Sequence, residues 1–237
     1  MTSPEMTIDC ALLDDMTARV GERLAAVRAR IDAVRRADRP IEIIAVTKGF
    51  GPEAALAALR NDLTLLGENY ADELVAKAKI VNASRELALG RTARWTFQGR
   101  LQSNKINRLL PIVDLWQSLD TNDRIAALAK RQPLAKVCIQ VRLTGDGDRS
   151  GADFDDVERL VENARTAGLL VVGLMGVGPD PDISGLEASR LAFRRLNELC
   201  QMSGVEWRSM GMSSDFELAI AEGATHIRIG TALFGDR

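Results

Sequence analysis

The chain has 237 residues, of which 46% are hydrophobic and 27% charged, and its formal net charge is −2. This length suits one barrel of alternating strands and helices, which needs roughly 200–250 residues, as well as two small domains. The balance of charge argues against a nucleic-acid-binding protein, because such proteins usually carry a surplus of lysine and arginine.

The cysteines and the single histidine argue against covalent or metal cross-linking. Cys10, Cys138 and Cys200 are far apart and form no C-x-x-C motif, and His226 has no second histidine near it. We therefore expect neither a disulfide framework nor a metal site. The N-terminal segment is acidic, unlike a signal peptide, and no apolar run approaches the roughly 20 residues that cross a bilayer. The sequence thus predicts a cytoplasmic protein with no membrane segment.

The first predicted element is a long amphipathic helix. Its apolar residues step by three or four from Leu13 to Val34, and we expect the helix to end near Pro40. Residues 41–47 are apolar and largely β-branched, which indicates a short buried strand. Pro52 then opens a second helix.

The same alternation recurs to the end of the chain. Further strands are predicted at residues 63–66, 94–98, 113–119, 136–143, 169–177, 206–210 and 226–229. Helices are predicted between them at residues 69–81, 103–109, 122–130, 153–167, 185–202 and 214–221. Eight strands, each but the last followed by a helix, favour an α/β fold that closes into a (β/α)8 TIM barrel. We expect a single domain over residues 1–237, with residues 1–40 as a helical extension packed on the barrel.

Lys48 directly follows the first predicted strand. In this type of barrel, functional side chains gather where strands end. Burial there would lower the pKa of the amine and make it a nucleophile that forms a Schiff base with an aldehyde. The alternative is a surface lysine whose long stem reaches solvent. Asn69, after the second predicted strand, either faces the barrel mouth or caps the next helix.

Two glycine-containing turns follow the seventh and eighth predicted strands. They are the sequence SMGMSSD at residues 209–215 and the pair Gly230-Thr231. Glycine permits a close backbone approach, and loops at these two positions are the usual phosphate site of such barrels. The alternative is two ordinary turns with a serine as a helix cap. Combined with Lys48, the turns predict a ligand with an aldehyde at one end and a phosphate at the other, such as pyridoxal phosphate or a phosphosugar aldehyde.

Six motifs carry a resemblance to a known family. They are AVTK at 45–48, LGENY at 66–70, WTFQGRLQSNK at 95–105, GLMGV at 173–177, SMGMSSDFELAIAEGAT at 209–225 and RIGTALFG at 228–235. In this order they resemble the YggS/PROSC family of pyridoxal phosphate homeostasis proteins. The resemblance implies a barrel similar to the N-terminal domain of alanine racemase.

The resemblance also implies roles for particular residues. Lys48 would hold pyridoxal 5′-phosphate as a Schiff base, Asn69 would lie beside the ring, and Arg228 would pair with the pyridine nitrogen. The residues that it implies around the phosphate are Ser209, Met212, Ser213, Gly230 and Thr231. Three positions depart from the family pattern: Thr96 and Gln98 replace a histidine and an apolar residue, and Arg142 replaces an asparagine. Arg142 and Arg149 could bind a further anion or lie in solvent.

The function that we expect is a carrier that takes part in homeostasis of the cofactor and passes it to apo-enzymes. An arginine at the pyridine nitrogen makes the ring a poorer electron sink. The racemase compensates with a tyrosine from a further domain, whereas the only tyrosine here, Tyr70, is not matched to that role. We therefore expect a binding protein rather than an enzyme, and the resemblance implies a monomer. The alternatives are a racemase-like enzyme, a Schiff-base aldolase, and a regulatory protein whose partner docks on the N-terminal helix.

Overall fold

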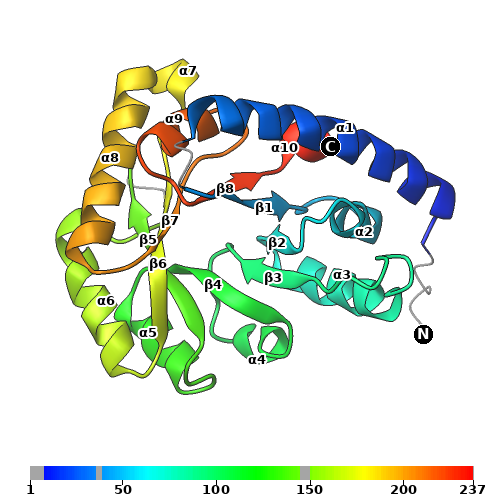
Figure 1. Ribbon diagram of the computed structural model, residues 1–237. Coiled ribbons are helices and arrows are strands. Elements are labelled where there is room, and N and C mark those ends of the chain that lie inside the picture. The colour runs from blue at the N-terminus through cyan, green and yellow to red at the C-terminus, as the bar shows by residue number, and fades with distance from the viewer. Residues whose placement is uncertain (1–7, 36–38, 145–149, 237) are drawn as a thin grey trace.

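The computed structural model describes residues 8–35, 39–144 and 150–236. Eight parallel strands pair in chain order and close into a barrel, because β1 pairs with both β2 and β8 (Figure 1). The strands are β1 (Glu42–Val46), β2 (Leu65–Glu68), β3 (Arg94–Phe97), β4 (Val113–Leu119), β5 (Lys136–Arg142), β6 (Leu170–Val177), β7 (Trp207–Ser209) and β8 (His226–Ile229). The predicted (β/α)8 barrel is confirmed.

Helices surround the barrel in the order that the sequence predicts, with the short helices α7 and α10 in addition (Figure 1). They are α1 (Cys10–Val34), α2 (Pro52–Arg60), α3 (Ala71–Ala83), α4 (Ile106–Leu109), α5 (Asn122–Ala129), the 3-10 turn η1 (Phe154–Asp156) with α6 (Val157–Thr166), α7 (Pro181–Ser184), α8 (Leu186–Met202), α9 (Phe216–Ala221) and α10 (Thr231–Phe234). One expectation was wrong, because the last strand is also followed by a helix, α10. Four residues are too few to show an apolar period, and α10 is held by the burial of Leu233 and Phe234.

The N-terminal helix α1 covers one side of the barrel. Asp9 caps it by accepting a hydrogen bond from the amide of Leu12 at 3.0 Å. Its apolar stripe is buried and contacts α2, α9 and α10. In Figure 1 this helix lies along the outside of the barrel, next to the C-terminal α10. The structure therefore agrees with a helical extension packed on the barrel, whereas the assignment of residues 1–237 to one domain extends beyond the described residues and stays a prediction.

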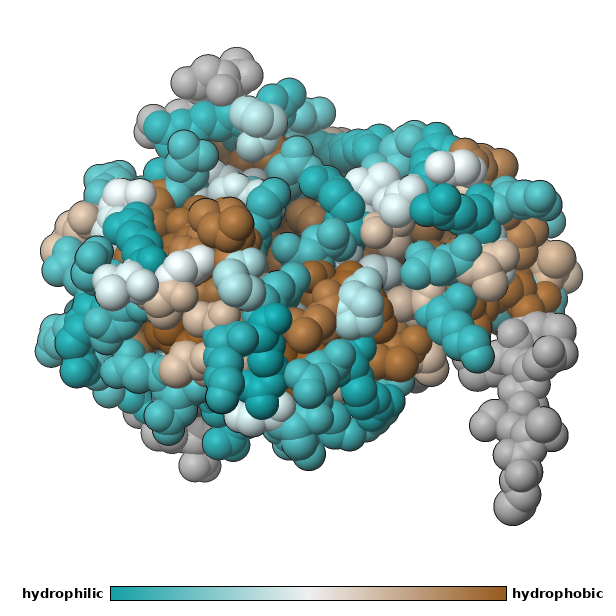
Figure 2. All heavy atoms as spheres, turned by 90° about the horizontal axis from the view of Figure 1, so that it is seen from below, coloured by the Kyte–Doolittle hydropathy of each residue, from teal (hydrophilic) through white to brown (hydrophobic). Residues whose placement is uncertain are grey.

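The core consists of the buried strands and the inner faces of the helices. In β1, four consecutive residues from Ile43 to Val46 are buried, as expected for a parallel strand that is covered on both faces. On the face drawn in Figure 2, hydrophilic residues predominate and apolar side chains show between them. Among the described residues, no helix combines the length and the apolar character needed to span a bilayer.

Candidate functional site

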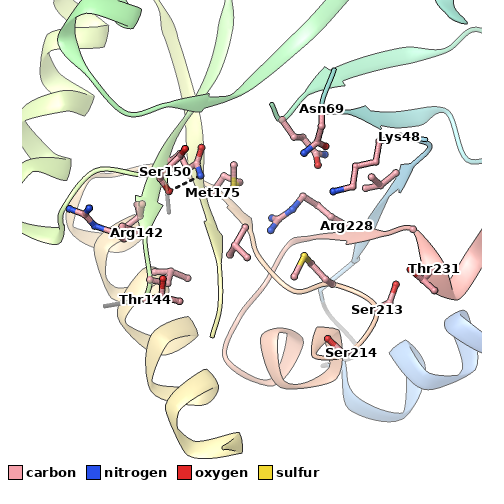
Figure 3. Close-up of a pocket in the computed structure, with 18 of the residues that line it drawn as sticks. Lys48, Asn69, Arg142, Thr144, Ser150, Met175, Ser213, Ser214, Arg228 and Thr231 are labelled. Atoms are coloured by element: carbon pink, nitrogen blue, oxygen red, sulfur yellow. Dashed lines mark hydrogen bonds between the residues drawn. The ribbon is translucent and has the colours of Figure 1, made fainter. Parts of the chain in front are cut away.

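A pocket of about 730 Å³ lies where the carboxyl ends of the strands meet. Seven of the predicted site residues line it: Lys48, Asn69, Met212, Ser213, Arg228, Gly230 and Thr231. They come from the ends of β1, β2 and β8 and from the turns after β7 and β8. In Figure 3, Lys48, Asn69 and Arg228 point toward the same space, with Ser213 and Thr231 on the turns beside it. Residues far apart in the sequence are thus brought together by barrel closure.

Lys48 is half-buried and enters this pocket from the end of β1. The residue before it, Thr47, is fully buried, and the residue after it, Gly49, has a φ of +77°. A positive φ suits glycine because it has no Cβ to clash with the backbone. The chain therefore turns sharply at Gly49 and leaves the lysine side chain at the pocket wall.

Arg228 is a buried cation on the pocket side of the barrel interior, with 5% of its surface exposed. Its Nη1 donates to the backbone oxygen and the hydroxyl of Ser209, at 2.6 and 3.1 Å, and its Nη2 donates to the carbonyl of Gly176 at 2.9 Å. Burial lowers the pKa of Arg228 to about 10, while the nearby charge of Asp215 opposes this shift. The side chain is still protonated at neutral pH, and the acceptors that hold it are neutral oxygens.

Ser209 does not line the pocket, although the resemblance implied that it lies around the phosphate. It is fully buried at the end of β7, and its hydroxyl donates to Oε1 of Gln117 at 2.7 Å. Its side chain therefore points into the barrel interior, one layer below the mouth, as alternate residues of a barrel strand do. In this position Ser209 orients Arg228 by accepting its two Nη1 hydrogen bonds.

The turns after β7 and β8 are held together by side chains. The buried Asp215 accepts a hydrogen bond from the amide of Met212 at 2.5 Å, and Ser213 accepts one from the amide of Ala232 at 3.1 Å. Asp215, not a serine, precedes α9 as its N-cap residue. Within the described part of the chain, the backbone N–H groups of Ser213 and Ser214 have no hydrogen-bond acceptor. They are available to an anion in the pocket.

Asn69 lies at the end of β2 and does not cap α3, whose N-cap residue is Tyr70. The Oδ1 atom of Asn69 is buried and lacks a partner within the described part of the chain. A buried amide oxygen without a donor is unfavourable, by about 1–3 kcal/mol, until a ligand or water supplies one. Tyr70 is 60% exposed and is not among the pocket-lining residues.

The three departures from the family pattern have structural explanations. Gln98 lines the pocket, and its Nε2 donates to the buried hydroxyl of Thr96 at 3.2 Å, so the two replacements form one hydrogen-bonded pair. Arg142 also lines the pocket, but its guanidinium pairs with Asp153, with Nε 3.1 Å from Oδ1. This ion pair reduces its capacity to bind a further anion. Arg149 lies outside the described residues.

Sequence reasoning missed part of the pocket wall. Gln140, on β5, lines the pocket and donates to the carbonyl of Ser150 at 3.0 Å. Met175, on β6, and Thr144 line it as well. Polar residues near the end of a predicted strand were a usable signal for Gln140, because strand ends form the mouth of such a barrel.

Comparison with known proteins shows to which family the chain belongs. The family model described as "Alanine racemase, N-terminal domain" matches residues 23–237. The Pseudomonas aeruginosa pyridoxal phosphate homeostasis protein is 36% identical, over 92% of this chain and 96% of that protein. The mouse protein of the same name is 32% identical, over 94% of this chain and 89% of its own length. The chain belongs to the pyridoxal phosphate homeostasis protein family.

Solved structures agree with this family membership. An unknown protein from Bifidobacterium adolescentis superposes with a TM-score of 0.85 and 29% identity, covering 96% of this chain and 98% of that one. A family relative, PipY of Synechococcus elongatus, has been solved with pyridoxal phosphate bound. That structure gives a TM-score of 0.76 and 28% identity, covering 91% of this chain and 100% of PipY. Alanine racemase from Bacillus anthracis shares the fold, with a TM-score of 0.67 and 18% identity over 95% of this chain and 56% of the racemase.

Proposed function

We propose that this family member binds pyridoxal 5′-phosphate through a Schiff base on Lys48, and that it stores and delivers the cofactor in the cytoplasm as a monomer. The observation that carries the proposal is the pocket in which the Lys48 side chain, the buried Arg228 guanidinium and the turns after β7 and β8 converge. The bound cofactor in PipY supports the same ligand for this chain.

The residues of the pocket fit the chemistry of this cofactor. A phosphate would be bound by the unused backbone N–H groups of Ser213 and Ser214, next to the hydroxyl of Thr231. The guanidinium of Arg228 would face the pyridine nitrogen, and the unpartnered Oδ1 of Asn69 would accept a hydrogen bond from the ligand or its water. When bound, the cofactor supplies an electrophilic aldehyde and an electron-withdrawing ring.

The composition of the pocket wall supports a carrier rather than a racemase. Among the described residues that line the pocket, the only titratable side chains are Lys48, Arg142 and Arg228. Two-base racemisation needs a second acid or base beside the lysine, and arginine stays protonated. Tyr70 is exposed outside the pocket, and His226 lies at the other end of β8. A bound amino acid would therefore find no second proton-transfer group in this wall.

The absorption spectrum of the purified protein with added pyridoxal phosphate tests the proposal. We expect a visible band in the wild type that borohydride removes, with the reduced cofactor attached to the peptide containing Lys48. Lys48→Ala should lose the band, whereas Lys136→Ala, at the exposed start of β5, should keep it. Absence of a band in the wild type would overturn the proposal and favour the aldolase alternative, in which a phosphosugar aldehyde occupies the pocket.

Two further assays separate a carrier from an enzyme. The loaded protein is mixed with a cofactor-free pyridoxal-phosphate enzyme, and recovery of that enzyme's activity reports delivery. The loaded protein is also incubated with L-alanine to detect racemisation. We expect delivery without sustained turnover. Turnover at ordinary enzyme rates, roughly 1–1000 per second, would instead establish the racemase alternative.

A further inference from the structure

A buried ammonium group contacts the backbone next to Lys48 and lies outside the pocket. Lys77, on α3, has a side chain that is 3% exposed. Its Nζ donates to the carbonyl of Thr47 at 2.7 Å, to Oε1 of Glu73 at 3.3 Å, and to Oε1 of Glu68. A lysine ammonium has three N–H donors, so these three acceptors satisfy it completely.

The cluster of Lys77, Glu68 and Glu73 holds the backbone on both sides of Lys48. On one side, the carbonyl of Thr47 accepts from Lys77, and the hydroxyl of Thr47 donates to Glu68 at 2.6 Å. On the other side, the amide of Gly49 donates to Oε1 of Glu73 at 2.6 Å. Both peptide groups that flank the Cα of Lys48 are therefore fixed by side chains from β2 and α3.

Fold stability alone gives a weak account of this cluster. Burying charges costs several kcal/mol per ion, about as much as their pairing returns, and well-packed apolar residues are often equally stabilising. Glu68 is fully buried, its Oε2 lacks a partner within the described part of the chain, and burial raises the pKa of its carboxyl while Lys77 opposes that shift. None of the three side chains lines the pocket. The cluster does, however, hold the backbone on both sides of Lys48 in place.

We propose that Lys77, Glu68 and Glu73 are positioning residues that fix the backbone of Lys48, so that its amine enters the pocket at one place and holds the cofactor against release. This inference rests on the proposed function. It goes further, because it assigns control of cofactor release to a charged cluster that does not touch the ligand.

Glu73 offers the cleanest substitutions, because its side chain is 26% exposed and lies in the first turn of α3. Glu73→Gln keeps an oxygen that accepts from the Gly49 amide, whereas Glu73→Leu does not. Lys77→Met removes all three donors at once. Arg60→Met is the matched control: its side chain is 16% exposed, it pairs with Asp14, and it ends α2 at the opposite end of the barrel.

The first readout is hydrogen exchange of the Gly49 amide in protein without cofactor. We expect exchange in Glu73→Leu to be at least roughly tenfold faster than in wild type, the factor that losing one charge-assisted hydrogen bond implies. Glu73→Gln should stay close to wild type. Arg60→Met should lower the melting temperature without changing Gly49 exchange.

The second readout is the rate of cofactor transfer from the loaded protein to an excess of cofactor-free enzyme. Glu73→Leu and Lys77→Met should release it severalfold faster than wild type, and Arg60→Met at the wild-type rate. Unchanged Gly49 exchange in Glu73→Leu, or release by both variants at the rate of Arg60→Met, would overturn the inference. If the wild type took up no cofactor, the proposed function would fail, and the exchange measurement would still decide whether the cluster holds the Lys48 backbone.

Discussion

Arg228 illustrates how this barrel keeps a charge in its interior. Its Nη1 donates to Ser209 and its Nη2 to Gly176, and Ser209 is in turn held by Gln117. A buried charge normally requires a partner of opposite charge or a dense set of dipoles. Here the acceptors are neutral, so the charge is oriented by the barrel while its field reaches the pocket. The orientation of a single residue thus depends on β4, β6 and β7 together.

His226 gives a prediction at the same scale. It is 5% exposed at the amino end of β8, its ring stacks on Trp207 with centroids 3.6 Å apart, and Nδ1 lies 2.8 Å from the hydroxyl of Thr225. Burial, followed by the charge of Arg94, lowers the pKa of His226 from 6.5 to about 4. Between these values the unfolded chain binds a proton that the folded chain does not. The contribution of the neutral His226 to the free energy of unfolding is therefore fully present above pH 6.5 and is lost as the pH drops toward 4.

We expect His226 to account for a loss of about 3 kcal/mol over this pH range. His226→Phe keeps an aromatic ring against Trp207 but does not titrate, so its stability should fall less than that of the wild type between pH 7 and pH 4. Urea denaturation of both proteins at each pH measures the difference, and the carboxylates that titrate in both cancel. Equal losses in the two proteins would contradict the prediction.

At the scale of elements, the site depends on how closely neighbouring strand ends approach. The chain leaves β3 through Gly99, and a Cβ atom there would overlap the backbone carbonyl of Asn69 at the end of β2. Backbone cannot move aside as a flexible side chain can. The close contact between the backbone at Gly99 and the backbone at Asn69 therefore fixes the position of Asn69 in the pocket wall.

Gly99→Ala should consequently lower the free energy of unfolding by about 1–3 kcal/mol, the usual cost of overpacking, and weaken cofactor binding by moving Asn69. Gly51→Ala is the control, because a Cβ there meets only the flexible carboxylate end of Glu53. Urea denaturation and a cofactor titration of both variants test this. A Gly99→Ala protein as stable as Gly51→Ala, with wild-type affinity, would show that these two backbone segments are free to separate.

At the scale of the whole molecule, α1 completes the outer layer of helices. Its buried residues Leu13, Leu24 and Ile31 lie on the face that packs on α2, α9 and α10. These three helices follow β1, β7 and β8, so α1 covers the place where the barrel closes. A partner that docked on this apolar stripe would have to displace α1 from the barrel. The structure therefore gives the stripe an intramolecular role and leaves only the outer face of α1 to other proteins.

Leu24→Ala tests the contribution of α1 to the fold. Leu24 is 3% exposed, and truncation of a buried leucine costs about 2–5 kcal/mol because transfer energy and a cavity add up. Leu12→Ala, in the same helix but 42% exposed, should change the free energy of unfolding by no more than about 0.5 kcal/mol. Urea denaturation compares the two. Equal effects would mean that α1 is only loosely attached.

Local sequence patterns predict the order of the strands, the closure of the barrel, and the positions of Lys48 and the glycine turns at its mouth. Apolar periodicity is a local property, so it located the strands, and the position of Lys48 after one of them followed directly. The glycine turns after β7 and β8 were readable for the same reason, since glycine marks the turns whatever surrounds them. These features depend on residues close together in the chain.

The three-dimensional packing of the chain, by contrast, sets which side chains face the pocket and what holds them. It places Ser209 beneath the mouth, puts Asp215 rather than a serine at the N-cap position of α9, and adds α10, which burial against the rest of the fold stabilises. It also brought Lys77 to the backbone of Thr47, thirty residues away. Such contacts join residues that are distant in the chain, so their geometry is set by barrel closure and strand register, which local sequence patterns do not encode.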